Sequence, residues 1–466
     1  MERERLGSRL GFILLSAGCA IGCGNVWKFP WMCGQYGGGG FVLIYILCLL
    51  LLGLPVMTME FAVGRAAQAS PIHMYQKLER KGQKWHLHGY VAFFGNIALM
   101  AFYTVVTGWI IYYFVRFLTG RTEDLGFVTM ITNPGVNVTY LAVTVSGRRY
   151  ILQKINHHTF RDVAGLMENI TSVTEFLRTK TDDPRSVLTL VKTADGASYL
   201  HAQEGYWRVY DFVEDTICLQ QPETDEDFYQ SAVGFGTFQQ LLAEFPAEKL
   251  HETIPNFHNT PDRYRAFLET LERDPMRRAA QVQPEIEFAL ARQSEMAALQ
   301  TALKAGELPL RVTHNDTKLN NVLLDAKTRK ALCVIDLDTV MPGSSLYDFG
   351  DSIRFGAATA AEDERDLSRM EMSLERFHVF TRGYVRSCPG LTQKELELLP
   401  LGAKTMTMEC GVRFLTDYLD GDHYFAVHRD GQNLDRARTQ FRLVADMEKK
   451  WNEMQKIVAE EANKER

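Results

Sequence analysis

Two short stretches carry the residues best suited to chemistry, THNDTKLNNVLLD at 313–325 and VIDLDT at 334–339. Phosphoryl transfer from a nucleotide needs Mg²⁺ on the phosphates and a carboxylate that orients the attacking hydroxyl. Magnesium takes a few oxygen ligands and keeps part of its water shell. We predict that Asp316 is the catalytic base or hydroxyl-orienting residue, and that Asn321 and Asp336 are metal ligands.

The spacing of these residues is more informative than any one of them. An HxDxxxxN segment followed by a carboxylate at the end of an apolar strand is typical of kinase-like phosphotransferases. A turn rich in Asn and Asp between two strands would need no catalysis, and it is the alternative. The combined spacing favours the kinase, with His314 supporting the loop rather than transferring protons.

A rival metal motif is DFG at 348–350, which has the letters of the protein-kinase metal motif. It lies far past Asn321 and follows MPGS rather than an apolar strand. We therefore predict that Asp348 and Asp351 organise a loop, and we keep Asp348 as the alternative metal ligand. No GxxxxGK[ST] segment occurs, which excludes a P-loop enzyme.

The elements around these motifs indicate a small β-rich lobe followed by a larger helical lobe. Alternating and helical apolar spacings predict strands at 139–145, 149–153, 188–191 and 205–212, a helix at 161–178, and further helices from 224 to 307. This order predicts an α+β protein-kinase-like bilobal phosphotransferase domain over 135–466, with the small lobe at about 135–215 and the large lobe at about 216–466.

The first 120 residues differ in kind from the rest. They carry ten Lys and Arg against four Asp and Glu, whereas the remainder carries 41 against 53. An acidic body of this size argues against a nucleic-acid partner, because phosphate affinity comes from clustered basic residues. Three apolar stretches reach the length of about 20 residues that a membrane helix needs. They predict an all-α membrane segment over 1–120 that contacts the lipid bilayer, with spans near 10–33, 40–63 and 89–118, and a junction at 121–134.

The first predicted span is irregular for a helix. It contains Gly18, Gly22 and Gly24, followed by Asn25 and Pro30. Broken helices of this type bind ions and substrates in secondary transporters. Glycines at this spacing also allow two helices to pack closely. The spacing alone leaves both possibilities open.

The longer strings RLGFILLSAGCAIGCGNVWKFPWMCGQYGGGGF, GLPVMTMEFAVGR and FYTVVTGW resemble the start of the neurotransmitter:sodium symporter family, over residues 8–120. The resemblance implies that sodium is bound by the carbonyls of Gly18, Ala20 and Ile21 and by the side chain of Asn25. It also implies that Tyr103 contacts the transported substrate and that Lys28 is a cation of the extracellular gate. Glu60 would be a carboxylate within the membrane. The family has many more spans than this chain, so both sodium sites would be incomplete. We predict that residues 1–120 are a truncated, non-functional symporter fragment.

The motifs HNDTKLNNVLLD, VIDLDTVMPGSSLYDFGDSIR, VRFLTDYLDGDHYF and HRDGQNLDRARTQFRL resemble the N-acetylhexosamine 1-kinases, which belong to the aminoglycoside phosphotransferase and choline kinase-like superfamily. The resemblance implies transfer of the γ-phosphate of ATP, with Mg²⁺, to the anomeric hydroxyl of GlcNAc or GalNAc. It also implies a sugar pocket at Asp316, Arg413 and Tyr424. The alternative for Arg413 is a surface ion pair with Asp417 one helical turn further on.

The small lobe departs from this family. The glycine-rich segment survives only as NPGVNVTY at 133–140, with Gly135, and the first strand is predicted to be incomplete. Gln153 occupies the place where a strand lysine is expected, with Lys154 beside it and Glu168 as a partner on the next helix. Phe212 to Glu214 are predicted to form the hinge that holds adenine. These residues are the expected nucleotide-binding set.

Charge predicts an orientation that conflicts with a kinase. Lys and Arg gather before the first span and between the second and third, so both regions are expected in the cytoplasm. Three spans would then deliver the kinase to the outer side, although it is expected to work only in the cytoplasm. Three hypotheses follow: a sugar kinase fused to a symporter fragment, a transporter fragment with an incidental kinase tail, or a catalytically impaired membrane-bound binding domain.

Overall fold

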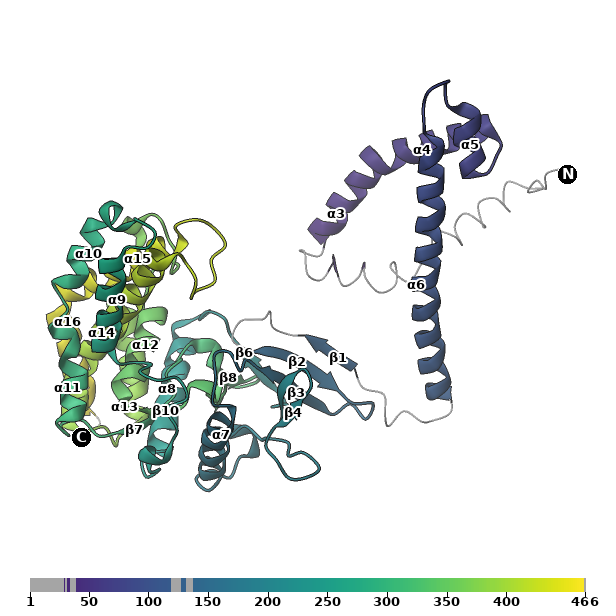
Figure 1. The fold of residues 1–466 in the computed structure, drawn as a ribbon. Helices are drawn as coiled ribbons and strands as arrows, with labels where there is room; N and C mark the ends of the chain where they lie inside the picture. The colour runs from purple at the N-terminus through teal and green to yellow at the C-terminus, as the bar shows by residue number, and fades with distance from the viewer. Residues whose placement is uncertain (1–28, 30–31, 34–38, 119–126, 131–136, 465–466) are drawn as a thin grey trace. The chain divides into compact units, whose positions relative to one another are not determined.

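The chain forms two compact units, Met1–Thr122 and Glu123–Arg466. The computed structural model describes residues 29, 32–33, 39–118, 127–130 and 137–464 (Figure 1). We describe each unit separately.

The first unit is helical and apolar. Its helices are α3 (Gly39–Cys48), the π-helical turn η2 (Leu49–Gly53), α4 (Leu54–Ala67), α5 (Pro71–Leu78) and α6 (His86–Leu118). Large apolar side chains along α3, η2 and α4, such as Leu51 and Leu52, are exposed. An exposed apolar surface of this kind needs a partner or a lipid environment.

Among the described residues, one helix, Gly39–Ala67, is long and apolar enough to cross a membrane. It contains the predicted span at 40–63. The predicted span at 89–118 falls within α6 and stays a prediction. The predicted span at 10–33 lies almost wholly outside the described residues.

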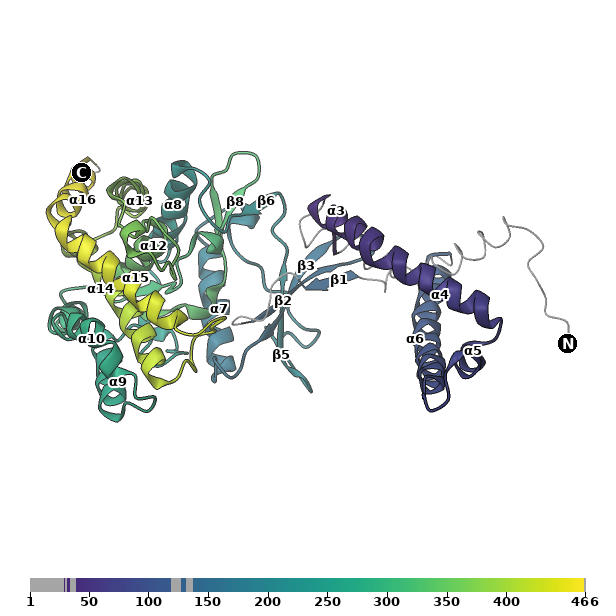
Figure 2. The ribbon, with the colours of Figure 1, turned by 90° about the horizontal axis from the view of Figure 1, so that it is seen from above.

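The small lobe of the second unit is an antiparallel sheet of order β1-β2-β3-β5-β4. Figure 2 shows β1, β2, β3 and β5 of this sheet. Its strands are β1 (Phe127–Met130), β2 (Val138–Val143), β3 (Arg149–Ile155), β4 (Leu200–Ala202) and β5 (Gly205–Asp211). Helix α7 (Val163–Arg178) contributes buried apolar residues to the core beneath this sheet. The sequence predicted that the first strand would be incomplete, yet β1 forms from the predicted junction and pairs with β2. The strand expected at 188–191 is reduced to a single bridge between Leu190 and Tyr210.

Residues 212–215 lead from β5 into the large lobe. There β6 (Thr216–Cys218), β8 (Val322–Asp325) and β9 (Ala331–Val334) form a three-stranded sheet, while β7 (Arg311–Thr313) pairs with β10 (Met341–Gly343). The helices are α8 (Asp225–Leu241), α9 (Thr260–Arg273), α10 (Gln283–Leu290), α11 (Ala298–Lys304), α12 (Ser345–Gly356), α13 (Leu374–Ser387), α14 (Gln393–Asp420), α15 (Gln432–Lys449) and α16 (Trp451–Lys464).

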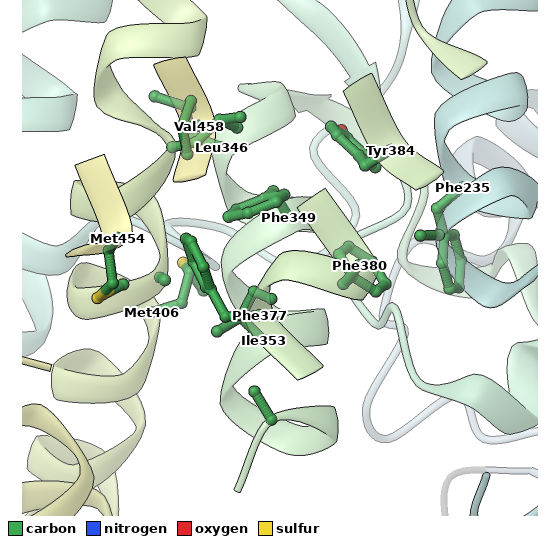
Figure 3. Packing of buried hydrophobic residues seen from close by; sticks show 14 of the residues in the cluster. Phe235, Leu346, Phe349, Ile353, Phe377, Phe380, Tyr384, Met406, Met454 and Val458 are labelled. Carbon is green, nitrogen blue, oxygen red and sulfur yellow. The ribbon is translucent and has the colours of Figure 1, made fainter. Parts of the chain in front are cut away.

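An aromatic cluster from α12 and α13 forms the centre of the large-lobe core (Figure 3). The ring of Phe349 lies 5.7 Å from that of Phe380 and 5.5 Å from that of Tyr384, in edge-to-face arrangements. Such pairs stabilise a core beyond the area that they bury. Gly350, beside Phe349, faces the Gly402 carbonyl of α14 so closely that a side chain would not fit. This packing fixes the start of α12, which carries Asp348 and Asp351.

Candidate functional site

The β8–β9 hairpin positions two of the three predicted catalytic and metal residues. Val322 pairs with Val334 in antiparallel register. Asn321 directly precedes β8 and Asp336 follows β9 by two residues, so both lie at the same end of the hairpin. The backbone N–H of Ile335 donates to the carbonyl of Asn321 at 2.9 Å, which extends the pairing to the site itself.

The structure brings Asp316 to this end as well. The Asn321 side-chain amide donates to the Asp316 carbonyl at 2.7 Å and to its carboxylate Oδ2 at 3.2 Å. The Asp316 carboxylate is half-buried and keeps access to solvent. A carboxylate fixed in this way, which still reaches solvent, suits the orientation of an acceptor hydroxyl.

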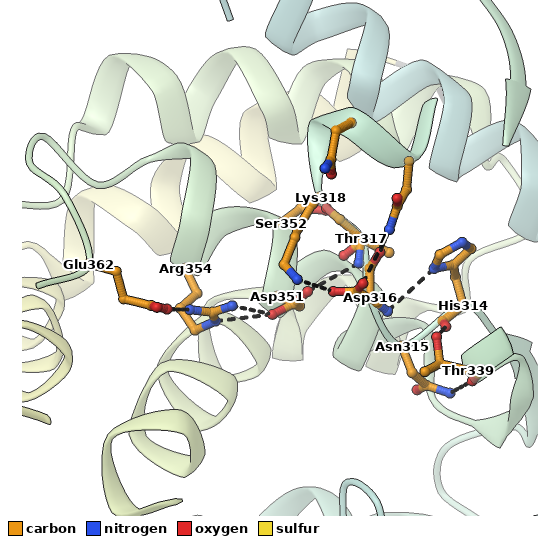
Figure 4. A network of polar contacts seen from close by, with 12 residues as sticks. His314, Asn315, Asp316, Thr317, Lys318, Thr339, Asp351, Ser352, Arg354 and Glu362 are labelled. Atoms are coloured by element: carbon orange, nitrogen blue, oxygen red, sulfur yellow. Dashed lines mark hydrogen bonds and ion pairs between the residues drawn. The ribbon is translucent and has the colours of Figure 1, made fainter. Parts of the chain in front are cut away.

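Lys318 is a site residue that the sequence motifs did not single out. Its Nζ lies 2.8 Å from the Asp316 Oδ1 (Figure 4). Burial disfavours the charged form, but the carboxylates of Asp316 and Asp351 outweigh it and raise the pKa of Lys318. The lysine is therefore cationic beside the Asp316 carboxylate. Its position two residues after Asp316 is the signal that could have found it.

Asp336 lies in a turn with a left-handed backbone, φ 59° and ψ 55°. The residue keeps solvent access, yet the surrounding protein disfavours its charge, and the carboxylates of Asp338 and Asp316 add repulsion. Together these effects raise the pKa of Asp336 to about 6. Crowded carboxylates whose charges are not fully compensated favour the binding of a cation.

The donor set fits magnesium. Asp336, Asn321 and Asp316 offer carboxylate and amide oxygens, and Mg²⁺ usually takes one or two carboxylates and fills its other positions with phosphate and water. The described part of the chain holds no cluster of three or more His, Cys, Asp or Glu side chains that could bind a metal. A site completed by nucleotide phosphates does not require such a cluster.

Asp348 holds the loop that contains His314, Asn315 and Asp316 through hydrogen bonds to its backbone. Its carboxylate is fully buried and accepts from the backbone N–H of His314 at 3.0 Å, that of Asn315 at 2.8 Å, and the Gln239 side chain at 2.7 Å. The left-handed Asn315, with φ 65°, is held by these bonds. The structure thus places Asp348 in the loop-organising role and not beside Asn321.

Asp351 supports the same loop one turn further along α12. It accepts from the backbone N–H of Thr317 at 3.1 Å and pairs with Arg354 at 3.0 Å (Figure 4). Although burial opposes ionisation, Arg354 and Lys318 hold the pKa of Asp351 below its usual value. An ionised Asp351 is therefore available to hold Lys318.

His314 uses both ring nitrogens within the loop. Nε2 lies 2.8 Å from the Ile335 carbonyl, to which it must donate, and Nδ1 accepts from the backbone N–H of Asp316 at 3.3 Å. Both contacts suit the neutral imidazole. The ring connects the catalytic loop to the metal turn, in the supporting role that the sequence predicts.

The predicted small-lobe residues are only partly brought together. Gln153 faces the neighbouring Arg208 on β5, which donates to it from Nε at 2.9 Å. Lys154 lies on the opposite face of β3, with its ammonium 5.7 Å from the Trp207 ring. Glu168 does not meet Lys154: its carboxylate is 73% exposed and lies 2.9 Å from His251. Gln153 and Lys154 cannot both face the same site, because adjacent residues of a strand point to opposite faces of the sheet.

The predicted hinge does join the two lobes. Arg149 donates from Nε to the Glu214 carboxylate at 3.0 Å, and its guanidinium lies 4.2 Å from the centre of the Phe212 ring. Gly135, the remaining nucleotide-binding prediction, lies outside the described residues.

Arg413 and Tyr424 lie together in the large lobe. The Arg413 guanidinium donates to the Tyr424 hydroxyl at 3.3 Å and also faces the rings of Phe257 and Phe425. Asp417, the alternative partner of Arg413, instead accepts from the backbone N–H groups of residues 423–425. Asp417 thus shapes the loop that presents Tyr424.

A buried pair links this helix face to the catalytic loop. Glu409, one turn before Arg413 on α14, lies 2.9 Å from Nδ1 of His258. Nε2 of His258 approaches the Asn315 carbonyl at 3.5 Å, beside Asp316. The Arg413 face of α14 therefore belongs to the neighbourhood of the catalytic carboxylate.

Most of the symporter-like site residues fall in the part of the chain that the structure does not describe. Gly18, Ala20, Ile21, Asn25 and Lys28 lie outside the described residues. Tyr103 lies in α6 and Glu60 in α4.

Comparison with protein families gives two matches. Residues 133–376, more than half of the chain, match the family model described as the phosphotransferase enzyme family. The chain belongs to this family. Residues 3–135 match the model of the sodium:neurotransmitter symporter family. Both family resemblances that the sequence suggested are confirmed at this level, and the second unit is a phosphotransferase domain.

Curated relatives of the N-terminal part are transporters. One is an uncharacterized sodium-dependent transporter, YhdH, of Bacillus subtilis, 36% identical over 149 residues, which cover 30% of this chain and 33% of the relative. Another is the rat sodium-dependent neutral amino acid transporter B(0)AT2, 35% identical over 114 residues, which cover 24% of this chain and 15% of the relative. The chain thus spans a third or less of the length of these transporters.

Solved structures similar to the phosphotransferase domain include an aminoglycoside phosphotransferase from Alicyclobacillus acidocaldarius, with a TM-score of 0.49 and 12% identity over 74% of this chain and 95% of that one. The ethanolamine kinase of Plasmodium vivax has a TM-score of 0.42 and 14% identity over 79% of this chain and 93% of that one.

Proposed function

We propose that the phosphotransferase domain transfers the γ-phosphate of ATP to the anomeric hydroxyl of an N-acetylhexosamine, GlcNAc or GalNAc. The observation that carries the proposal is the meeting of Asp316, Asn321 and Asp336 at one end of the β8–β9 hairpin. Membership of the phosphotransferase enzyme family supports the reaction class.

Each residue has a distinct role in this proposal. Asp316 accepts a hydrogen bond from the sugar hydroxyl, aligns it for attack and takes its proton. Lys318 forms an ion pair with Asp316 and offers a positive charge to the transferred phosphoryl group. Asn321 and Asp336 would hold Mg²⁺, which neutralises charge on the phosphates.

The acceptor class rests on Arg413 and Tyr424. A guanidinium held among aromatic rings, with a tyrosine hydroxyl beside it, offers hydrogen-bond donors and flat apolar surfaces to a sugar. A cationic acceptor such as choline or an aminoglycoside would meet repulsion from Arg413. The sugar is the better fit to this charge.

A substrate panel tests the acceptor. We expect ADP release with GlcNAc or GalNAc to exceed that with choline, ethanolamine or aminoglycosides by at least about tenfold, the effect of roughly 1.4 kcal/mol in transition-state binding. The product should carry phosphate at C1, as shown by its loss of reducing-end reactivity. A preference for a cationic acceptor would overturn the sugar assignment and keep the phosphotransferase.

We propose that the symporter-like part resides in the membrane but does not transport. A half-built sodium site leaves the ion under-coordinated, which is costly in a low-dielectric setting. We expect vesicles with the full chain to show no sodium-dependent uptake of labelled amino acids above protein-free vesicles. Sodium-coupled uptake would establish the transporter hypothesis instead.

Protease protection of the same vesicles tests whether the phosphotransferase domain lies on the cytoplasmic side, where ATP is available.

A further inference from the structure

The small lobe has no lysine at the inward position of β3. Protein kinases use such a strand lysine, paired with a helix glutamate, to hold the nucleotide phosphates. Here Gln153 occupies the position, Lys154 faces the other side, and Glu168 pairs with His251. A buried cation on the inner face is Arg208 of β5, directly opposite Gln153 in the strand register.

Arg208 is directed at the metal turn. Its side chain is 1% exposed, and it forms an ion pair with Asp338, which is 3% exposed. The Asn137 side chain, just before β2, donates to the other oxygen of the same carboxylate. One oxygen of Asp338 thus lies against the Arg208 guanidinium and the other accepts from Asn137, whereas Asp336 is the carboxylate of this turn that faces solvent.

The donors on the small-lobe side are themselves fixed. Gln153 accepts from Arg208 and donates to the Thr139 hydroxyl at 3.0 Å. Asn137 accepts from the backbone N–H of Asn156 at 2.9 Å. Strands β2, β3 and β5 thus converge on one buried carboxylate.

The turn that carries Asp338 also holds the catalytic loop. The hydroxyl of Thr339 donates to the His314 carbonyl at 2.6 Å, and Asn315 donates from its side chain to the Thr339 carbonyl at 2.8 Å. A displacement of Asp338 would therefore shift both Asp336, two residues before it, and the segment that ends in Asp316.

We infer that Arg208 and Asp338 are positioning residues that couple the nucleotide-covering sheet to the metal-bearing turn, with Arg208 in place of the missing strand lysine. The inference rests on the proposed function, because it assigns the coupling to the Mg²⁺-nucleotide site. A buried ion pair suits such coupling, because separating the charges leaves each without compensation in a low-dielectric setting. The sheet and the turn therefore keep one relative position.

The test measures Mg²⁺-dependent binding of a fluorescent ATP analogue to the full-length protein in detergent, without sugar, together with the Mg²⁺ dependence of turnover. The decisive variant is Arg208→Met with Asp338→Leu, since apolar replacement of both partners of a buried pair is often tolerated by the fold. We expect near-wild-type melting, with Mg²⁺-nucleotide binding weakened at least about tenfold and a matching rise in the Mg²⁺ concentration for half-maximal turnover. Arg208→Lys, which keeps the charge but loses the planar fork, should fold and show a smaller loss of the same kind.

The matched control is Arg292→Met with Glu448→Leu. This pair, with distances of 2.9 and 2.7 Å, joins the end of α10 to α15 within the large lobe. Its removal should leave Mg²⁺-nucleotide binding unchanged.

The outcomes separate the two claims. Wild-type nucleotide affinity in a folded Arg208 variant, single or double, would overturn the coupling while the proposed function stood. An equal loss in the control would overturn it too, because the effect would then be general. Wild-type protein that binds no Mg²⁺-nucleotide would overturn the proposed function and the coupling with it.

Discussion

Asp316→Asn should lower turnover by about 10²–10⁴-fold, the usual contribution of a general base, while Mg²⁺-nucleotide binding persists. The substitution keeps the side-chain size and an oxygen near the Asn321 amide, so the loop should keep its conformation. What it removes is the negative charge that accepts the hydroxyl proton and pairs with Lys318. The substitution should therefore lower kcat and leave the affinity for the nucleotide nearly unchanged.

Two measurements check this expectation. Steady-state ADP release with saturating acceptor gives kcat, and titration with a fluorescent nucleotide gives affinity. The matched control is Asp420→Asn, at the end of α14, whose carboxylate lies 3.5 Å from Arg273 at the surface. Unchanged turnover in the Asp316 variant would remove this carboxylate from the mechanism.

The meeting of Asn321 and Asp336 could be predicted from the sequence because their spacing is tied to a hairpin. Asn321 and Asp336 flank two short apolar strands, and antiparallel pairing must bring the flanks together. The same pattern favoured Asp336 over Asp348 as the metal ligand, since no apolar strand precedes Asp348, and that assignment stays a prediction. Where two residues flank the strands of one hairpin, their spacing in the sequence is enough to predict that they lie close together in the fold.

The small lobe could not be predicted to the same depth. The sequence offered Lys154 and Glu168 as an ion pair, but one residue of strand register decides which face a side chain occupies. Arg208 gave no local signal, because its importance comes from Asp338, 130 positions away in the chain. Contacts between such distant residues depend on the final packing of the lobes.

The first strand shows another limit of prediction from sequence. The residues that should precede the glycine-rich segment are replaced by RTEDLGFVTM, so the first strand was expected to be incomplete and 121–134 to be a junction. In the structure, β1 nevertheless pairs its four residues with β2. Backbone pairing at a sheet edge tolerates many side chains, so an edge strand can form from a sequence with little pattern of its own.

Asp348→Asn should lower the stability of the fold, whereas Asp336→Asn should abolish Mg²⁺-dependent nucleotide binding without lowering stability. Asp348 is buried and accepts from two backbone N–H groups and the Gln239 side chain. An amide at this position turns an NH₂ group toward one of these donors, and each buried donor left unsatisfied costs about 1–3 kcal/mol. We expect a clear fall in melting temperature, with activity lost in proportion to the damaged loop.

Asp336→Asn should leave the fold intact. The surrounding protein and the neighbouring carboxylates disfavour the charge of Asp336 and raise its pKa, so a neutral amide relieves that repulsion. The melting temperature should stay level or rise, while Mg²⁺-dependent nucleotide binding and turnover are lost. Melting by circular dichroism and nucleotide titration with and without Mg²⁺ separate the two variants.

The rival assignment makes the reverse prediction. If Asp348 were the metal ligand, its Asn variant would melt normally and lose Mg²⁺ dependence, and Asp336→Asn would keep wild-type binding. The geometry opposes that result: three donors hold the fully buried Asp348 carboxylate against the loop, whereas Asp336 keeps solvent access beside Asp316. Asp348 could bind a metal ion only if the hydrogen bonds that it accepts from the backbone of residues 314 and 315 were rebuilt.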